Sequence, residues 1–177
     1  MRHPGHKAYP PLTWWIPLVL LAVSACGGAG PPPREATDAS LRIISEADAV
    51  GIISDTIRAT GAELESGWEV DIAAEEPLQV DIRLEGTNYG VEWVSSQDRL
   101  DYGTAIPDPD PDGQLRILPG AGEDEEAQIL VLDFRTYRYD PDPERVRGGA
   151  PGAREVESRL RRDVRDFLEY VRGQGAI

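Results

Sequence analysis

An apolar stripe along residues 153–172, close to the C-terminus, is the feature that most constrains the fold. Its members recur at the 3.6-residue spacing of a helix: Val156, Leu160, Val164, Phe167, Leu168 and Val171. The stripe therefore predicts a long amphipathic helix packed on a sheet. Docking of a partner or of a membrane is the alternative, but the opposite face mixes acids with bases and is not a basic lipid-binding surface.

The middle of the chain changes to the two-residue period of strands. Apolar and polar residues alternate most regularly from Leu78 to Leu84. Gly86-Thr-Asn88 supplies turn residues after this segment, which predicts an antiparallel hairpin. The last expected strand is apolar enough to be central in the sheet. The expected strands are residues 68–72, 78–84, 89–94, 115–118 and 127–139.

A first helix is expected to begin after Ser45, whose side chain caps it, with Asp48 three residues on and Gly61 as a stop. Residues 41–44 suit either a short strand or a helical turn. Together these signals predict one α+β domain over residues 40–177. We expect an antiparallel sheet of about four to five strands, with the N-terminal helix and the long C-terminal amphipathic helix packed on it.

The N-terminus has the layout of a secretory signal, with Arg2 and Lys7 ahead of an apolar run over residues 14–23. That run has about ten residues, whereas a membrane-spanning helix needs about twenty. Pro17 further disfavours a spanning helix. Residues 1–25 are therefore expected to be a signal peptide.

Val23-Ser-Ala-Cys26, directly after the apolar run, resembles the lipobox of bacterial lipoproteins. The resemblance implies that Cys26 is joined through its sulfur to diacylglycerol, that the chain is cut just before it, and that the new amino group receives a fatty acid such as palmitate. Ordinary signal cleavage at the small residues is the alternative. The lipoprotein interpretation is favoured because Cys26 is the only cysteine and lies at the required position.

Residues 26–39 lack large apolar side chains, and their Gly and Pro content predicts a tether reaching about 30 Å from the bilayer. Gly27 follows the cysteine. In lipoproteins of Gram-negative bacteria, a residue other than Asp at this position implies sorting to the outer membrane. The expected location is therefore the cell envelope, at the outer membrane facing the periplasm if the host has two membranes.

Loss of residues 1–25 would remove every Lys and His, and Cys26 would carry lipid. This excludes Ser-His-Asp and Cys-His catalysis, Schiff-base chemistry, and zinc sites built from imidazole or thiolate. No cofactor other than the lipid is expected, apart from the calcium considered below. An enzyme of this composition would depend on carboxylates, hydroxyls, Tyr or Arg.

The charge balance argues against a nucleic-acid partner. Of 18 basic residues, Arg2 and Lys7 leave with the signal, so 16 remain against 32 acids and the formal charge becomes −16. Phosphates would be repelled. The arginine cluster in the C-terminal helix is interleaved with aspartates, which is typical of a salt-bridged solvated face; it comprises Arg159, Arg161, Arg162 and Arg165.

The stretch PDPDPDG at residues 107–113 resembles the start of an EF-hand calcium loop. Asp108, Asp110, Asp112 and Gly113 match its positions one, three, five and six, but Pro119 stands where the loop needs a bidentate Glu. Three carboxylates without that anchor would bind calcium weakly, in the millimolar range.

The competing interpretation of PDPDPDG is a stiff, charged connector that ends in a turn. A shorter copy at residues 140–143 has no metal pattern around it, which favours the connector. A second acidic loop at residues 123–126 would strengthen a metal site only if both loops converged.

Carboxylate pairs such as Glu85 and Glu92, on either side of the hairpin turn, are the remaining catalytic candidates. A glycosidase needs two carboxyls about 5 to 10 Å apart in a cleft. Exposed strands carry acids routinely, so no residue is assigned a catalytic role and the chain is not expected to be an enzyme. The sequence predicts a lipid-anchored envelope lipoprotein that binds another envelope protein or polymer, or serves as a scaffold. The alternative is a weak calcium-binding or carboxylate-dependent envelope enzyme.

Overall fold

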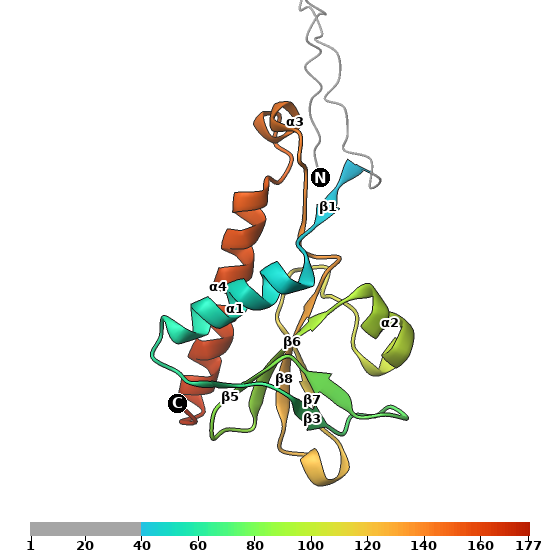
Figure 1. Ribbon diagram of the computed structural model, residues 1–177, viewed down its shortest axis with the longest axis vertical. Helices are drawn as coiled ribbons and strands as arrows, with labels where there is room; N and C mark the ends of the chain where they lie inside the picture. Colours follow the sequence, from blue (N-terminus) through green and yellow to red (C-terminus); the bar gives the residue numbers. More distant parts are fainter. Residues whose placement is uncertain (1–39) are drawn as a thin grey trace, which may run out of the picture. The chain divides into compact units, whose positions relative to one another are not determined.

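The computed structural model describes residues 40–177, which belong to one compact unit (Figure 1). The expected signal peptide, tether and lipidation site at Cys26 lie outside the described residues. The helices are α1 (Glu46–Arg58), α2 (Ser96–Tyr102), α3 (Pro143–Arg147) and α4 (Ala153–Gly173), with two 3-10 turns, η2 (Gly103–Ala105) and η3 (Gly122–Asp124). The strands are β1 (Arg42–Ile43), β2 (Leu64–Glu65), β3 (Trp68–Val70), β4 (Leu78–Val80), β5 (Ile82–Leu84), β6 (Tyr89–Val94), β7 (Arg116–Pro119), β8 (Gln128–Asp133) and β9 (Arg138–Tyr139).

The main sheet has five strands in the order β2-β5-β6-β8-β7. The predicted hairpin is confirmed, because β5 and β6 pair antiparallel and Gly86 between them has a positive φ of 71°. Two further pairs, β3 with β4 and β1 with β9, form separate two-stranded sheets. The predicted α+β class, with an N-terminal helix and a long C-terminal helix, is confirmed.

The central pair β6–β8 is parallel, so the sheet is mixed and the prediction of a wholly antiparallel sheet is wrong at this point. Residues 95–127 connect the two strands, which is long enough for the crossover that a parallel pair requires. Within this connection β7 takes the outer edge, antiparallel to β8. Five of the six residues in each central strand are buried, as is typical of strands covered on both faces.

Two segments predicted as single strands are each divided in the structure. Residues 78–84 break at Asp81, so that β4 pairs with β3 while β5 belongs to the main sheet. Residues 127–139 break after β8, and β9 turns away to pair with β1. Residues 42–43 of the ambiguous 41–44 segment thus form a strand.

One face of the sheet is covered by α1 and α4, which cross each other (Figure 1). All six residues of the predicted α4 stripe are buried, and Phe167 packs edge-on against Tyr89 of β6 at 6.3 Å between ring centroids. Helix α1 begins after Ser45, as predicted, and the Ser45 hydroxyl accepts the Asp48 N–H. The helix pair therefore rests on an apolar layer, which we call the first cluster.

The opposite face of the sheet carries a second apolar layer, the second cluster. Its cover is the β3–β4 pair together with residues next to α2. It consists of Val70, Ile72, Leu78, Val80, Val94, Ile106, Leu118, Ala127, Ile129 and Val131. The sheet is thus enclosed between two apolar layers of different construction.

Helices α2 and α3 were not predicted, because both are short and neither has a buried residue. A signal for α2 is nevertheless present: Ser95 and Asp98 form a reciprocal capping box at its start. Among residues 40–177, no helix combines the length and apolar character needed to cross a membrane.

Replacement of Gly90 by Ala is expected to lower the free energy of unfolding by about 1 to 3 kcal/mol, since overpacking forces neighbours apart. A Cβ there would lie 2.8 Å from the Trp68 ring and 2.9 Å from the Val80 side chain, between the sheet and the β3–β4 layer. Gly51→Ala is the matched control. A Cβ on Gly51 would meet nothing within 4 Å, so this variant should gain about 0.5 to 1 kcal/mol. Urea unfolding measures both, and an unchanged Gly90→Ala would contradict the packing described.

Candidate functional site

Two carboxyl side chains, Asp81 and Glu92, meet at the corner where β4 passes into β5. The register of the β5–β6 hairpin, Ile82 with Val91, places them beside each other. The Asp81 N–H donates to Glu92 Oε2 at 3.0 Å, and the Trp93 N–H donates to Asp81 Oδ2 at 2.8 Å. Each carboxyl therefore accepts a backbone N–H from the facing strand and bridges the break in the strand.

The Glu92 side chain lies inside the molecule, with 3% of its surface exposed. Its neighbours in sequence, Val91 and Trp93, belong to the first cluster, whereas Val94 belongs to the second. Because side chains alternate along a strand, Glu92 points toward the second layer. A carboxyl group is thus held beneath the β3–β4 cover.

Burial sets the protonation of this pair. It raises the pKa of Glu92 to about 9, and the neighbouring Asp81 charge adds to the effect. Burial also raises the pKa of Asp81 to about 6, although the Trp93 N–H opposes that shift. At neutral pH Glu92 therefore keeps its proton while Asp81 is largely ionised. Two carboxyls with separated pKa values can exchange a proton, but both hydrogen bonds from the protein go to backbone, which is the geometry of a structural joint.

Sequence reasoning singled out Glu92 but gave it the wrong partner. Glu85 is exposed, and a hydrogen bond with the Glu63 carboxyl raises its pKa. Glu92 instead contacts the backbone of Asp81. The partner follows from the register of the β5–β6 hairpin. Because Ile82 pairs with Val91, the next position outward on each strand places Glu92 opposite Asp81.

The three aspartates of the proposed calcium loop mostly contact arginine. The Asp108 carboxylate accepts a hydrogen bond from Arg135 at 2.7 Å, and Asp110 forms an ion pair with Arg116 at 2.7 Å. Asp112 is exposed, and its N–H donates to Asp110 Oδ1 at 2.8 Å, as in an Asx turn. Within residues 40–177 no three acidic, imidazole or thiolate side chains are grouped to hold a metal ion. Calcium binding here stays a prediction of the sequence.

The same connector is fixed to the sheet through Asp133, the last residue of β8. Its buried carboxylate accepts Arg99 Nε at 2.7 Å and Arg135 Nε at 2.9 Å. Burial would raise the pKa of Asp133, but the hydrogen bonds from the two guanidinium groups outweigh it and hold the pKa below its usual value. Arg99 also donates to the carbonyls of Ile106 and Pro107 at 2.7 and 2.8 Å, so one arginine joins sheet and connector.

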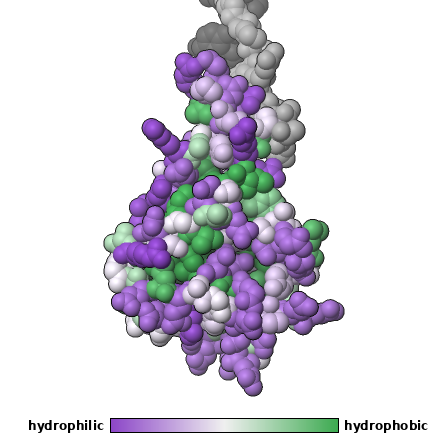
Figure 2. Space-filling view, viewed as in Figure 1, coloured by the Kyte–Doolittle hydropathy of each residue, from purple (hydrophilic) through white to green (hydrophobic). Residues whose placement is uncertain are grey.

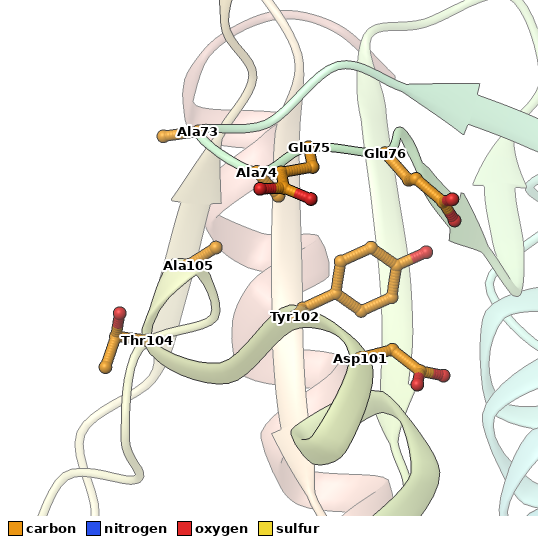
Figure 3. Close-up of a pocket in the computed structure, with 8 residues that line it drawn as sticks. All are labelled: Ala73, Ala74, Glu75, Glu76, Asp101, Tyr102, Thr104 and Ala105. Atoms are coloured by element: carbon orange, nitrogen blue, oxygen red, sulfur yellow. The ribbon is translucent and has the colours of Figure 1, made fainter.

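An open pocket of about 450 Å³ lies between residues 73–76 and the end of α2 (Figure 3). Three carboxylates line it, from Glu75, Glu76 and Asp101, and the Tyr102 ring forms part of its wall. The Tyr102 hydroxyl donates to the Pro77 carbonyl at 3.0 Å, which fixes the ring. The negative charge of the three carboxylates in this pocket would repel an anionic ligand.

Comparison with known proteins assigns no family to the chain. No family profile matches the sequence, and neither the curated proteins nor the solved structures give a significant match. Function therefore has to be inferred from the chain's own residues.

Glu92→Gln is expected to stabilise the fold, increasingly as pH rises. Glu92 ionises near its ordinary 4.5 in the unfolded chain but only at about 9 in the fold. Stability is therefore lost as pH rises between these values, by about 1.4 kcal/mol per pH unit. Gln keeps an acceptor for the Asp81 N–H and has no proton to lose, so at pH 7 the gain should be about 3 kcal/mol.

Urea unfolding at several pH values between 5 and 9 measures this difference. Glu69→Gln, which removes an exposed acid from β3, is the control and should change stability by less than about 0.5 kcal/mol at each pH. If the free energy of unfolding of wild type and of Glu92→Gln changed with pH by the same amount, the fold would not retain the Glu92 proton.

Calcium at several millimolar is expected to leave the melting temperature unchanged, because arginines already pair with Asp108 and Asp110. A calcium-dependent rise that disappears in Asp110→Ala would contradict this and support the metal site. Arg116→Ala is the matched control, since it breaks the same ion pair but keeps the carboxylate. A rise that survives in Arg116→Ala would come from the carboxylate itself.

Proposed function

We propose that this protein is a lipid-anchored lipoprotein of the cell envelope, whose α+β domain is a binding or scaffolding module at the membrane surface. The observation that carries the proposal is Val23-Ser-Ala-Cys26, a lipobox-like sequence directly after a charged and then apolar leader. In a host with two membranes, Gly27 after the cysteine supports sorting to the outer membrane, with the domain in the periplasm.

The proposed anchor accounts for how the domain would stay at the membrane. Each buried methylene contributes about 0.8 kcal/mol, and two or three acyl chains on Cys26 make attachment effectively permanent. Residues 27–39 would link the anchor to β1, the first strand of the domain. The partner would then be met at a limited distance from the bilayer.

The surface of the domain indicates what kind of partner such a module would bind. Figure 2 shows mostly hydrophilic side chains on the face in view, with apolar residues between them in its middle part. The large hydrophobic residues that are exposed among residues 40–177 are scattered: Ile43, Leu100, Tyr170 and Ile177. An acidic surface of this kind suits a basic partner or a polymer with cationic groups, and it disfavours nucleic acid and anionic lipid headgroups.

Cys26→Ser is expected to abolish lipidation and release the domain from the membrane fraction. Intact mass and N-terminal peptide mass spectrometry should show wild type beginning at Cys26 with two or three acyl chains. Ser24→Ala, which keeps a small residue in the lipobox, is the control and should remain lipidated. A wild-type chain that keeps its leader, or that is cut without acylation and found free of membrane, would contradict the proposal.

The partner can be sought by comparing proteins that co-purify with the wild type and with Cys26→Ser. The mature chain would contain no Lys, and its N-terminal amine would be acylated. Amine-reactive cross-linkers would therefore miss the complex, and carboxylate-reactive or photoactivated reagents are required. A partner held by the acidic surface should dissociate as the salt concentration rises.

A further inference from the structure

The corner at Asp81 is the point where the second layer joins the main sheet. On one side of it, β4 pairs with β3 from Trp68–Val80 to Val70–Leu78; on the other side, β5 pairs with β6. Two hydrogen bonds, from the Asp81 N–H to the Glu92 carboxyl and from the Trp93 N–H to the Asp81 carboxyl, hold this corner against β6. The attachment of the β3–β4 layer to the sheet therefore includes two carboxyl groups.

The charged groups that act on the pair are acidic. The charges of Glu46, in the first turn of α1, and Asp98, in the first turn of α2, both disfavour its ionisation. Tyr102, at the end of α2, is the other titratable group coupled to Glu92, and the Glu92 charge helps to raise the pKa of its hydroxyl. Within the described part of the chain, both carboxyls accept backbone N–H groups and neither pairs with an arginine. The proton is thus what keeps this pair from carrying two adjacent negative charges.

Loss of that proton would place two carboxylates next to each other, Glu92 buried beneath an apolar cover and Asp81 half-buried at its edge. Burial of unpaired charges is strongly unfavourable, and like charges in contact add to the cost. Water can reach the pair if the β3–β4 layer lifts. That layer is small, with three residues in each strand, and its apolar contacts belong to the second cluster, separate from α4. Local opening of the β3–β4 layer would therefore hydrate the two carboxylates at a lower free-energy cost than unfolding of the whole domain.

We propose that the Asp81–Glu92 pair is a proton-controlled latch: it holds the β3–β4 layer on the sheet while protonated, and releases that layer when both carboxyls are ionised. Release uncovers the apolar face of β6 and β8, including Val94, Ile129 and Val131. This apolar face is then exposed to solvent in alkaline surroundings and covered in acidic ones. This latch is independent of the lipid anchor.

Pulse hydrogen exchange on the full chain, at pH 6 and at pH 10, tests the latch. Rates are divided by those of unstructured peptides at the same pH. At pH 6, amides of residues 68–80 and of α4 should both be protected. At pH 10, residues 68–80 should exchange within about tenfold of the unstructured rate, while α4 stays protected by at least about a thousandfold. If both segments lose protection together, the domain unfolds as one unit and the proposal is overturned.

Glu92→Gln should keep residues 68–80 protected by about a hundredfold or more at pH 10, because one charge in the pair is removed. Asp81→Asn provides an independent second variant: it removes the like charge but leaves Glu92 to ionise under the same cover, so its layer should open at a higher pH than in wild type. Glu69→Gln removes an exposed charge from the same layer and should open like wild type. Opening of Glu92→Gln at pH 10, an Asp81→Asn that opens at the same pH as wild type, or a closed Glu69→Gln would overturn the proposal.

Discussion

The parallel contact between β6 and β8 is the constraint on which the rest of the structure depends. Five of six residues in each strand are buried, so both faces of the pair need an apolar cover. Helices α1 and α4 supply one cover through the first cluster, and the β3–β4 pair supplies much of the other through the second. The ion pairs around Asp133 and the corner at Asp81 both lie where the chain leaves or enters these layers.

The domain buries carboxyl groups in two different ways. Asp133 and Asp140 are buried beside arginine, with Arg145 Nε 2.6 Å from Asp140 Oδ2. Their charges are compensated by a group that does not titrate in the physiological range. Glu92 is buried among acids and compensated by its own proton. The first arrangement is insensitive to alkaline pH and the second is not, so the buried carboxyl groups of one domain respond differently to the same medium.

The sequence allowed the elements to be predicted better than their connections. The α4 stripe, the Ser45 cap and the β5–β6 hairpin were predictable because each depends on neighbours within a few residues. The parallel direction of β6 and β8 was not predictable. The alternation of apolar and polar residues indicates which face of a strand is buried, but it does not indicate which strand pairs with it. The break at Asp81 was hidden for the same reason, because an acid at a polar position of an alternating strand looks ordinary. Glu92 was noticed, but its partner follows only from the hairpin register.

The crossover between β6 and β8 also affects how much conformational entropy the chain loses on folding. Tyr89 and Gln128 are register partners, so the first contact joins residues that are 128 − 89 = 39 positions apart in the sequence. Closing such a segment costs conformational entropy, and that cost falls when the segment is already restricted in the unfolded chain. Pro107, Pro109 and Pro111 lie inside it. These prolines stiffen the unfolded chain, which reduces the entropy that the central contact has to overcome.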